Sequence, residues 1–407
     1  MSIQFLPTVS NLAEAIEALQ SNEHSSTCFG IEIETIDLSL LETESLPFPY
    51  FFWKSRSSNI SYHAWGISEC YASFNQVPQT AFPRFVCLPF SSPSKTNTWK
   101  NFPVQMIWKP CWCLEQGKKN ILYHSPTLIN REKQNTDHIP APKENPNEEN
   151  WIKNIIQSKQ DFSTTSLEKI VLARQSRRSC SRPYQLFEEL RRIQKNCYHF
   201  LFSPNRKEVF FGVSPERLLQ IREGTLYTEA LAGTRERSLD ETRNNILSRD
   251  LFRSEKDQHE HGIVIQYIED TLRSFCDDIT IEKKQLLSLH HVQHLQTPIK
   301  ATLSAAYSLE NLIQALHPTP AVCGLPKQEA MNKIHCFENY DRGFYAGTMG
   351  IITKERIDLT VTIRSALWQD GQLLIWAGAG IVAQSNPKEE WMELNNKAKQ
   401  FFERVDI

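Results

Sequence analysis

The sequence predicts a protein that mixes helices and strands, and two patterns indicate this class. Runs of apolar and β-branched residues, typical of strands, recur after residue 150. They are KIVLARQ (169–175), EVFFGVS (208–214), TLYTEALAG (225–233), IDLTVTIRSAL (357–367) and LLIWAGAGIV (373–382). Between and after them lie segments whose apolar residues recur every three or four positions, as in helices. These are 183–194, 257–275, 308–316 and 387–405.

The first 140 residues show the same mixture but no pattern typical of a catalytic motif. NLAEAIEALQ (11–20) has a helical pattern, whereas FGIEIETIDL (29–38) and FPRFVCLPF (82–90) resemble strands. DHIPAPKENPNEEN (137–150) is rich in Pro, Asn and charged residues, which predicts a surface connection. We therefore expect the chemistry to lie beyond residue 150.

Composition and charge favour a soluble intracellular protein that acts on a small molecule. The 45 Lys and Arg nearly balance the 47 Asp and Glu, which does not favour nucleic acid or an anionic membrane as a partner. The ten Cys have no repeating spacing, which fits buried thiols in a reducing cytoplasm. The N-terminus lacks a signal-peptide pattern, and the apolar stretch near the C-terminus is too short to span a bilayer. We expect a cytoplasmic protein without a membrane partner.

Glu260 has an unusual position in the predicted helix 257–275. Val264, Ile268 and Phe275 belong to its apolar stripe, and Glu260 lies four residues before Val264, in the same stripe. A carboxylate that faces a core is costly unless it is paired, hydrogen-bonded or bound to a metal. The sequence therefore predicts a partner for Glu260.

Acidic residues also occur beside the apolar stripe of the predicted C-terminal helix. This helix begins after Ser-Asn-Pro, a favourable combination of N-cap and first helical residue. Glu390, Glu393 and Lys397 follow one flank of the stripe. One interpretation is a solvated face with a Glu393–Lys397 ion pair, worth about 0.3 kcal/mol. The other is that carboxylates of this helix and Glu260 meet at an oxygen-liganded cation such as Mg2+.

Arg364 and two glycines are candidates for binding an anionic ligand. The predicted strand 357–367 alternates apolar and polar residues, so Arg364 either lies on an ordinary half-exposed strand or clamps a carboxylate. AGAGIV (377–382) contains Gly378 and Gly380 but lacks the GxGxxG pattern of dinucleotide sites. Its glycines either permit close packing or let backbone N–H groups approach an anion.

Lys169 and Glu216 are candidates for a base and an acid. Each alone would be interpreted as a surface charge, but burial lowers the pKa of a lysine and raises that of a carboxylic acid, which suits proton transfer. His290, His291 and His294 lie close together in the sequence. No HExxH pattern accompanies them, so a zinc site is not expected.

Several motifs follow one another in a distinctive order after residue 150. They are EKIVLAR, GVSPERLL, EALAGTR, SEKDQHEH, QHLQTPIKATL, HPTPAVCGLP, RGFYAGTMG, TIRSAL and AGAGIVAQSNPKEEWMELNNKA. As an ordered set they resemble the chorismate-utilising enzymes, namely the isochorismate, salicylate, anthranilate and aminodeoxychorismate synthases. The resemblance implies an α+β fold in which large antiparallel sheets form a central sandwich flanked by helices. It also implies a catalytic region at 150–407 and a divergent N-terminal portion, 1–145, that belongs to the same body.

The resemblance also implies roles for the candidate residues. Glu260 and Glu393 would be ligands of Mg2+, with Glu390 close behind them, and the ion would hold the ring carboxylate of chorismate. The implied substrate-binding positions are Thr234, His294, Tyr345, Arg364, Gly378, Gly380 and Lys397.

Lys169 and Glu216 distinguish among the reactions of this family. Lys169 occupies the position at which members that use water carry Lys, and it would be the general base for attack at C2 of chorismate. Glu216 would be the general acid that protonates the departing C4 hydroxyl. Ala232 stands where aminodeoxychorismate synthases carry a nucleophilic Lys, and no obligatory amidotransferase subunit is expected. The resemblance therefore predicts an isochorismate synthase of menaquinone or siderophore biosynthesis.

Two alternatives stay open at this point. A salicylate synthase would form isochorismate and then eliminate pyruvate in the same pocket. A degenerate homologue would bind without turnover, although every position expected to do chemistry holds a competent residue. Cys323 in HPTPAVCG stands where relatives carry a glycine, which bears on the shape of that loop.

Overall fold

The computed structural model describes residues 3–20, 28–35, 47–78, 80–91, 97–103, 105–125 and 144–405. Positions 137–143 of the predicted surface connection lie outside these residues. The remainder of that connection leads into the first long helix of the catalytic region, which begins at Glu148. No helix within the described ranges is long and apolar enough to cross a membrane.

The larger sheet joins strands from the two ends of the chain. Its members are β1 (Ile3–Phe5), β2 (Val9–Asn11), β3 (Cys28–Thr35), β4 (Tyr50–Lys54), β5 (Ser61–Trp65), β9 (Trp112–Gln116), β10 (Asn120–His124), β11 (Glu144–Asn145), β12 (Lys169–Ser179), β13 (Tyr198–Asn205), β14 (Glu208–Ser214), β20 (Gly324–Leu325), β23 (Ser365–Gln369) and β24 (Gln372–Ile381). Their order is β1-β3-β10-β9-β5-β4-β13-β14-β23-β24-β12-β11, with β2 beside β3 and β20 beside β12. The β1–β3 and β2–β3 pairs are parallel.

The second sheet is antiparallel and draws most of its strands from the C-terminal portion. Its members are β6 (Glu69–Tyr71), β7 (Arg84–Leu88), β8 (Met106–Lys109), β15 (Arg217–Arg222), β16 (Thr225–Glu236), β17 (Cys276–Ile281), β18 (Gln285–Ser288), β19 (Val292–Leu303), β21 (Thr348–Ile352) and β22 (Ile357–Val361). Their order is β17-β19-β16-β15-β22-β21-β7-β8-β6, with β18 beside β19.

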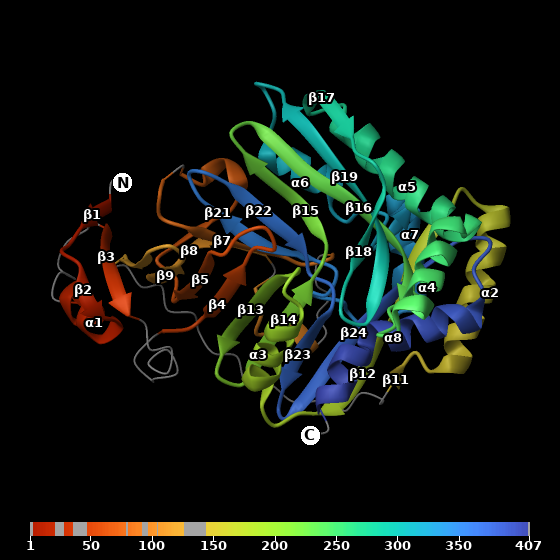
Figure 1. The fold of residues 1–407 in the computed structure, drawn as a ribbon, viewed down its shortest axis with the longest axis horizontal. Helices are drawn as coiled ribbons and strands as arrows, with labels where there is room; N and C mark the ends of the chain where they lie inside the picture. Colours follow the sequence, from red (N-terminus) through yellow and green to blue (C-terminus); the bar gives the residue numbers. More distant parts are fainter. Residues whose placement is uncertain are drawn as a thin grey trace.

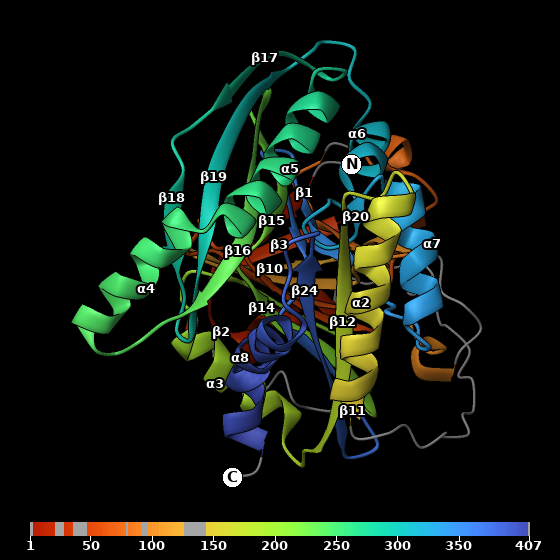
Figure 2. The ribbon, with the colours of Figure 1, turned by 90° about the vertical axis from the view of Figure 1, so that its right-hand side faces the viewer.

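The helices lie outside the sheets, and several gather along one side. They are α1 (Leu12–Gln20), α2 (Glu148–Thr164), α3 (Pro183–Ile193), α4 (Glu241–Arg253), α5 (Glu255–Leu272), α6 (Leu309–Leu316), α7 (Lys327–Phe337) and α8 (Pro387–Val405), with 3-10 turns η2 (Phe74–Gln76) and η3 (Asn97–Trp99). Helices α2, α4, α5, α7 and α8 lie on the right in Figure 1 and face the viewer in Figure 2.

The two sheets pack against each other through an aromatic core. Phe51 of β4 and Phe85 of β7 have ring centroids 5.0 Å apart, and Phe51 also lies 5.4 Å from Trp108 of β8. Phe202 of β13 lies 5.8 Å from the same Trp108. Each of these aromatic side chains is buried, and burial of such rings contributes strongly to folding. The predicted α+β fold, with large antiparallel sheets between outer helices, is confirmed.

Strands of the N-terminal portion continue the sheet of the catalytic region. β4 pairs antiparallel with β13, which joins residues 50–54 to residues 198–205. A smaller apolar cluster, which includes Leu19, Ile31 and Leu114, packs α1 against the far end of that sheet. Figure 1 shows α1, β1, β2 and β3 at the left end of the molecule.

Within the described residues the predicted elements agree with the structure except at one strand, and positions 36–38 of the strand predicted at 29–38 lie outside the described residues. The single strand predicted at 357–367 is wrong, because β22 ends at Val361 and β23 begins at Ser365. Between them the Thr362 hydroxyl donates to the Phe344 carbonyl, and Arg364 has a positive φ of 53°. These residues therefore leave the strand direction to bond the 344–347 segment. The predicted helix 387–405 is confirmed as α8.

Candidate active site

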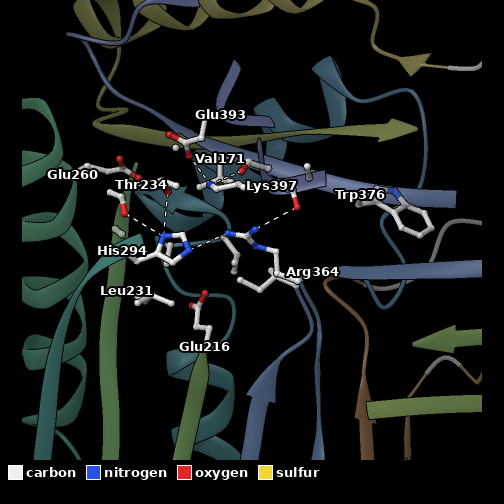
Figure 3. A pocket seen from close by; sticks show the side chains of 18 of the residues that line it. Val171, Glu216, Leu231, Thr234, Glu260, His294, Arg364, Trp376, Glu393 and Lys397 are labelled. Carbon is white, nitrogen blue, oxygen red and sulfur yellow. Dashed lines mark hydrogen bonds and ion pairs between the residues drawn. The ribbon is translucent and has the colours of Figure 1, made fainter. Parts of the chain in front are cut away.

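A cavity lies where β12, β16, β19 and β24 meet α5 and α8 (Figure 3). All the predicted site residues except Lys169 and Glu390 contribute to its wall. The lining residues are Val171, Glu216, Leu231, Ala232, Gly233, Thr234, Glu260, His294, Ala321, Val322, Tyr345, Ile363, Arg364, Trp376, Ala377, Gly378, Gly380, Glu393 and Lys397. Residues from 171 to 397 thus converge on one cavity.

Lys169 lies directly behind the cavity wall, against Glu260. Its ammonium is 3.1 Å from Glu260 Oε1, and the lysine is fully buried. Gly380 of β24 makes this contact possible, because a Cβ atom there would lie 2.0 Å from Glu260 Oε1 and 3.1 Å from Lys169 Cε. The core-facing carboxylate predicted from the sequence therefore faces a buried lysine, and the glycine gives it the space.

Lys256, which the sequence analysis did not select, pairs with the acidic side chains of two helices. Its Nζ lies 2.7 Å from Glu390 Oε1 on α8 and 4.0 Å from Glu260 Oε2 on its own helix, α5. Burial alone would lower the pKa of Lys256, but Glu390 and Glu260 outweigh burial and raise it. Lys256 is therefore held as a cation. Its position four residues before Glu260 was the sequence signal that could have identified it.

Glu393 and Glu390 have opposite electrostatic environments although they lie on the same helix. Burial acts to raise the pKa of Glu393, but Lys397, whose Nζ is 2.5 Å from Glu393 Oε1, and Lys256 outweigh it and lower the pKa. For Glu390 burial prevails over Lys256 and raises the pKa to about 7. The predicted Glu393–Lys397 ion pair is present, and it lines the cavity rather than a solvated face.

The acidic side chains provide oxygen donors that would suit a hard cation. Glu260 and Glu393 line the cavity, and the buried Oε2 atom of Glu390 has no hydrogen-bond partner among the described residues. Carboxylate oxygens are preferred ligands of Mg2+, so the donor chemistry fits this ion. Across the described part of the chain, no three His, Cys, Asp or Glu side chains form a cluster that could already hold a metal. Each carboxylate is instead balanced by a lysine.

Arg364 and His294 form a buried pair on another wall of the cavity. The Arg364 guanidinium donates to His294 Nε2 at 3.0 Å and to the Lys397 carbonyl at 3.3 Å. His294 Nδ1 is 3.2 Å from the Gly233 carbonyl, which can only accept, so Nδ1 carries the proton and Nε2 accepts. Burial, with Arg364 adding to it, holds the pKa of His294 well below its usual value. Thr234 completes the group, with Oγ1 3.2 Å from His294 Nδ1.

Tyr345 and Gly378 lie at the next part of the wall. The Tyr345 ring stacks on Trp376 with centroids 5.9 Å apart. A Cβ atom at Gly378 would lie 2.7 Å from the Tyr345 hydroxyl, so the glycine leaves room for this ring. The carbonyl of Gly378 accepts a hydrogen bond of 2.8 Å from Lys397 Nζ. Of the two interpretations of these glycines, close packing is directly visible in the contacts of Gly378 and Gly380.

Glu216 projects into the cavity from the connection between β14 and β15, away from the acidic cluster (Figure 3). Its backbone is fixed on β22, because its carbonyl accepts from the Thr360 hydroxyl at 2.5 Å and from the Val361 N–H at 3.1 Å. Burial, with a contribution from Glu229, raises the pKa of Glu216 to about 8. At neutral pH this side chain is therefore a carboxylic acid that can donate a proton.

The remaining histidines of the predicted cluster do not join the site. His290 and His291 contact each other, with ring centroids 4.5 Å apart, and His291 Nε2 lies 3.4 Å from Glu403. Only His294 of the three lines the cavity. All ten cysteines are free thiols. Cys323 is fully buried beside Gly324, which has a φ of 145°.

Comparison with known proteins places the chain in one family. The family described as "Chorismate binding enzyme" matches residues 118–405. Isochorismate synthase MenF of Haemophilus influenzae is 31% identical over 420 residues, covering 96% of this chain and 96% of that protein. The salicylate biosynthesis isochorismate synthase of Pseudomonas aeruginosa is 41% identical over 230 residues, 55% of this chain and 48% of that protein.

A solved structure agrees with this match over nearly the whole length. It is the structure of MenF, the menaquinone-specific isochorismate synthase from Escherichia coli, with a TM-score of 0.79 and 26% identity. The match covers 95% of this chain and 98% of that one. The chain that builds this cavity is therefore a member of the chorismate binding enzyme family.

Proposed function

We propose that this protein is an isochorismate synthase that converts chorismate into isochorismate. In the proposed reaction water attacks C2 of chorismate, the ring double bonds shift, and the C4 hydroxyl leaves. One water is consumed and one is released, so the net change is an isomerisation. The observation that carries the proposal is the placement of two buried groups. Glu216, whose pKa burial raises, projects into the cavity away from Glu260, and Lys169 is buried directly behind Glu260.

Glu216 is the proposed general acid. A departing hydroxyl needs a proton, and a carboxyl whose pKa is raised to about 8 by burial still carries one at neutral pH. The fixed backbone of Glu216 limits the positions that its side chain can take. This favours one direction of proton donation.

Lys169 is the proposed general base. Its side chain is fully buried, and an amine nitrogen at this position would accept a proton from the attacking water. Its Nζ has no hydrogen-bond acceptor in the described structure, and its one close charge is Glu260 at 3.1 Å. The amine lies against Glu260, which lines the cavity, and we propose that it takes the proton of the attacking water at this part of the wall.

The cavity also offers groups that would bind the two carboxylates of chorismate. Arg364 is buried, and its described hydrogen bonds go to neutral acceptors, so its charge is available for a substrate carboxylate. We propose that Arg364 and Tyr345, with the backbone at Gly378 and Gly380, bind the enolpyruvyl carboxylate. Glu260 and Glu393, with Glu390 behind them, would hold a Mg2+ ion, which would supply positive charge to the ring carboxylate.

The cellular role is part of the proposal. We propose that the protein acts in the cytoplasm on chorismate, without nucleic acid, membrane or an amidotransferase subunit as an obligatory partner. Menaquinone biosynthesis is the proposed pathway, because the solved structure that matches over 95% of the chain is that of a menaquinone-specific enzyme. The name of the Pseudomonas relative keeps salicylate or siderophore biosynthesis as the alternative.

The direct test is incubation of the purified protein with chorismate and Mg2+ in water enriched in oxygen-18, without ammonia. Isochorismate that carries one heavy oxygen at C2 is the expected product, identified by chromatography and mass spectrometry. Salicylate and pyruvate would instead assign the bifunctional reaction to the same site. A product that forms only after ammonia is added would overturn the role given to Lys169.

A further inference from the structure

A turn of the N-terminal portion reaches the connection that carries Glu216. Residues 55–57 begin the connection between β4 and β5 in the larger sheet, and all three contact the second sheet. The Ser55 hydroxyl donates to Asp358 Oδ2 of β22 at 2.6 Å, and Gln220 of β15 donates to the Ser57 hydroxyl at 3.2 Å. Between them, Arg56 points toward the connection that carries Glu216.

Arg56 holds two groups next to Glu216 at the same time. One guanidinium nitrogen donates to the carbonyl of Pro215, the residue immediately before Glu216. The other donates to Glu229 Oε2 at 2.6 Å. The side chain of Arg56 is 12% exposed and that of Glu229 is 2% exposed, so this pair is largely shielded from water. A planar guanidinium is suited to such two-point contact, which an ammonium cannot reproduce.

Glu229 is held as an anion although it is buried. Besides Arg56, it accepts from the Arg217 backbone N–H at 3.1 Å and from Gln296 Nε2 at 2.7 Å. Burial acts to raise its pKa, but Arg56 and Arg217 outweigh burial and lower it. A fixed negative charge therefore lies beside Glu216.

We propose that Arg56 and Glu229 are positioning residues for the proton donor Glu216. Arg56 fixes the backbone before Glu216 and orients Glu229, and the charge of Glu229 keeps the proton on Glu216 until substrate takes it. This inference rests on the proposed function, because it requires Glu216 to be the general acid. It gives the N-terminal portion a part in the reaction, which Arg56 exerts through Glu216.

The positively charged groups around Glu216 lower its pKa, whereas burial and Glu229 raise it. Burial is the largest influence and raises the pKa of Glu216, and Glu229 raises it further. Lys169 of β12, Lys397 of α8 and Arg364 lower it. Arg364 and Lys397 line the cavity, and Lys169 lies directly behind its wall, whereas Glu229 is a negative charge that substitution can remove without altering the lining.

Glu229→Gln is the first test, since it removes the charge and keeps the shape and an acceptor for Gln296. We expect the alkaline limb of the kcat/KM profile against pH to move to lower pH, with KM for chorismate unchanged. Asp161→Asn is the matched control, because Asp161 is a buried carboxylate that pairs with Lys333 at 2.8 Å outside the cavity lining. It should leave the profile where it is. A Glu229→Gln profile that coincides with that of the control would overturn the inference.

Substitutions of Arg56 test the geometric half of the proposal. Arg56→Lys keeps the charge but loses the two-point contact, and Arg56→Met loses both. We expect kcat to fall in the order wild type, Lys variant, Met variant, while KM changes little, because Glu216 donates its proton but does not bind chorismate. Loss of thermal stability in both variants with kcat unchanged would show that the turn only holds the fold together.

Glu216→Gln separates failure of this inference from failure of the proposed function. If that variant retains isochorismate formation and its alkaline limb, Glu216 is not the acid and the proposed function loses its proton donor. If Glu216→Gln is inactive while the Glu229 and Arg56 variants behave as wild type, the acid role stands and the positioning role is refuted.

Discussion

Three Lys–Glu ion pairs lie at one end of the cavity. Two of them join different elements, and the third joins neighbouring turns of helix α8. Lys169 pairs with Glu260, Lys256 with Glu390, and Lys397 with Glu393. A buried ion pair adds little net stability, because the cost of desolvating two charges offsets most of their attraction. The arrangement is therefore better explained by a charged ligand in the cavity than by stability.

Substitution of Lys169 should lower both the rate of the reaction and the stability of the fold, and the two effects can be measured separately. Lys169→Ala should reduce isochorismate formation by about 10²- to 10⁴-fold, the usual contribution of a general base. It also leaves Glu260 without its near partner, which should lower the free energy of unfolding by about 3 kcal/mol. Steady-state kinetics and urea unfolding measure the two effects.

The Lys169 experiment needs a lysine that is paired but not in the cavity as its control. Lys333 pairs with Asp161, and neither residue of this pair lines the cavity, whereas Glu260, the partner of Lys169, does. Lys333→Ala should therefore keep wild-type turnover. Water-dependent activity in the Lys169 variant equal to that of this control would remove Lys169 as the base.

The raised pKa of Glu216 predicts the pH dependence of the reaction. The proton donor is present below its pKa of about 8 and is lost as the pH rises through that value, so kcat/KM should fall above about 8. The same sign holds for stability, because a carboxyl with a raised folded-state pKa stabilises the fold at low pH and loses that contribution as the pH rises to about 8. A pH profile without an alkaline limb in this region would contradict the assignment.

We expect Gly380 to be essential for the position of the Glu260 carboxylate, because a larger residue would collide with it. In Gly380→Ala the new Cβ would lie 2.0 Å from Glu260 Oε1, so the carboxylate has to move away from its present position. We expect affinity for Mg2+ to fall about tenfold or more, as when the support of a ligand is lost. Calorimetric titration with Mg2+ measures this directly, and unchanged affinity would show that Glu260 is not a ligand.

At the scale of elements, helices α5 and α8 bring the acidic residues together, and much of this was visible in the sequence. The 387–405 helix was predicted with its bounds, and its start is capped as expected by Asn386, whose side-chain oxygen accepts from Lys388 N at 3.0 Å. The polar residue in the apolar stripe of 257–275 is indeed buried. The strand break before Arg364 was not predictable, because it depends on hydrogen bonds to a segment whose spatial position no periodicity reveals.

Substitution of one residue in helix α5 should increase the stability of the protein without changing the cavity. Gly262 lies within α5, and a Cβ atom there would meet nothing within 4 Å. Gly262→Ala should raise the free energy of unfolding by about 0.5–1 kcal/mol, because alanine loses less backbone entropy in a helix. Thermal and urea unfolding measure the gain. The variant is also the matched Gly-to-Ala control for Gly380→Ala, and turnover should stay at the wild-type value.

At the scale of the whole molecule, the order of motifs predicted the fold and implied that residues 1–145 belong to the same body, but the contact of that portion with the connection that carries Glu216 was not visible in the sequence. Arg56 and Glu229 are separated by 173 positions, and neither lies in a pattern that links them. Pairing of this kind is set by the β4–β13 register and by packing of the two sheets. Local sequence patterns carry no information about such long-range contacts.

The shared sheet and core predict that the catalytic region does not fold alone. A protein of residues 144–407 would expose the edge of β13 that now pairs with β4, and it would lose Phe51, Phe85 and Trp108 from the aromatic core. We expect this truncated protein to aggregate or to unfold without a cooperative transition, because an exposed edge and a missing half-core are both unfavourable. Scanning calorimetry and size-exclusion chromatography of the truncated and full-length chains make the comparison. A truncated protein that unfolds cooperatively and forms isochorismate would show that the first 143 residues are dispensable, and it would refute the positioning role of Arg56 as well.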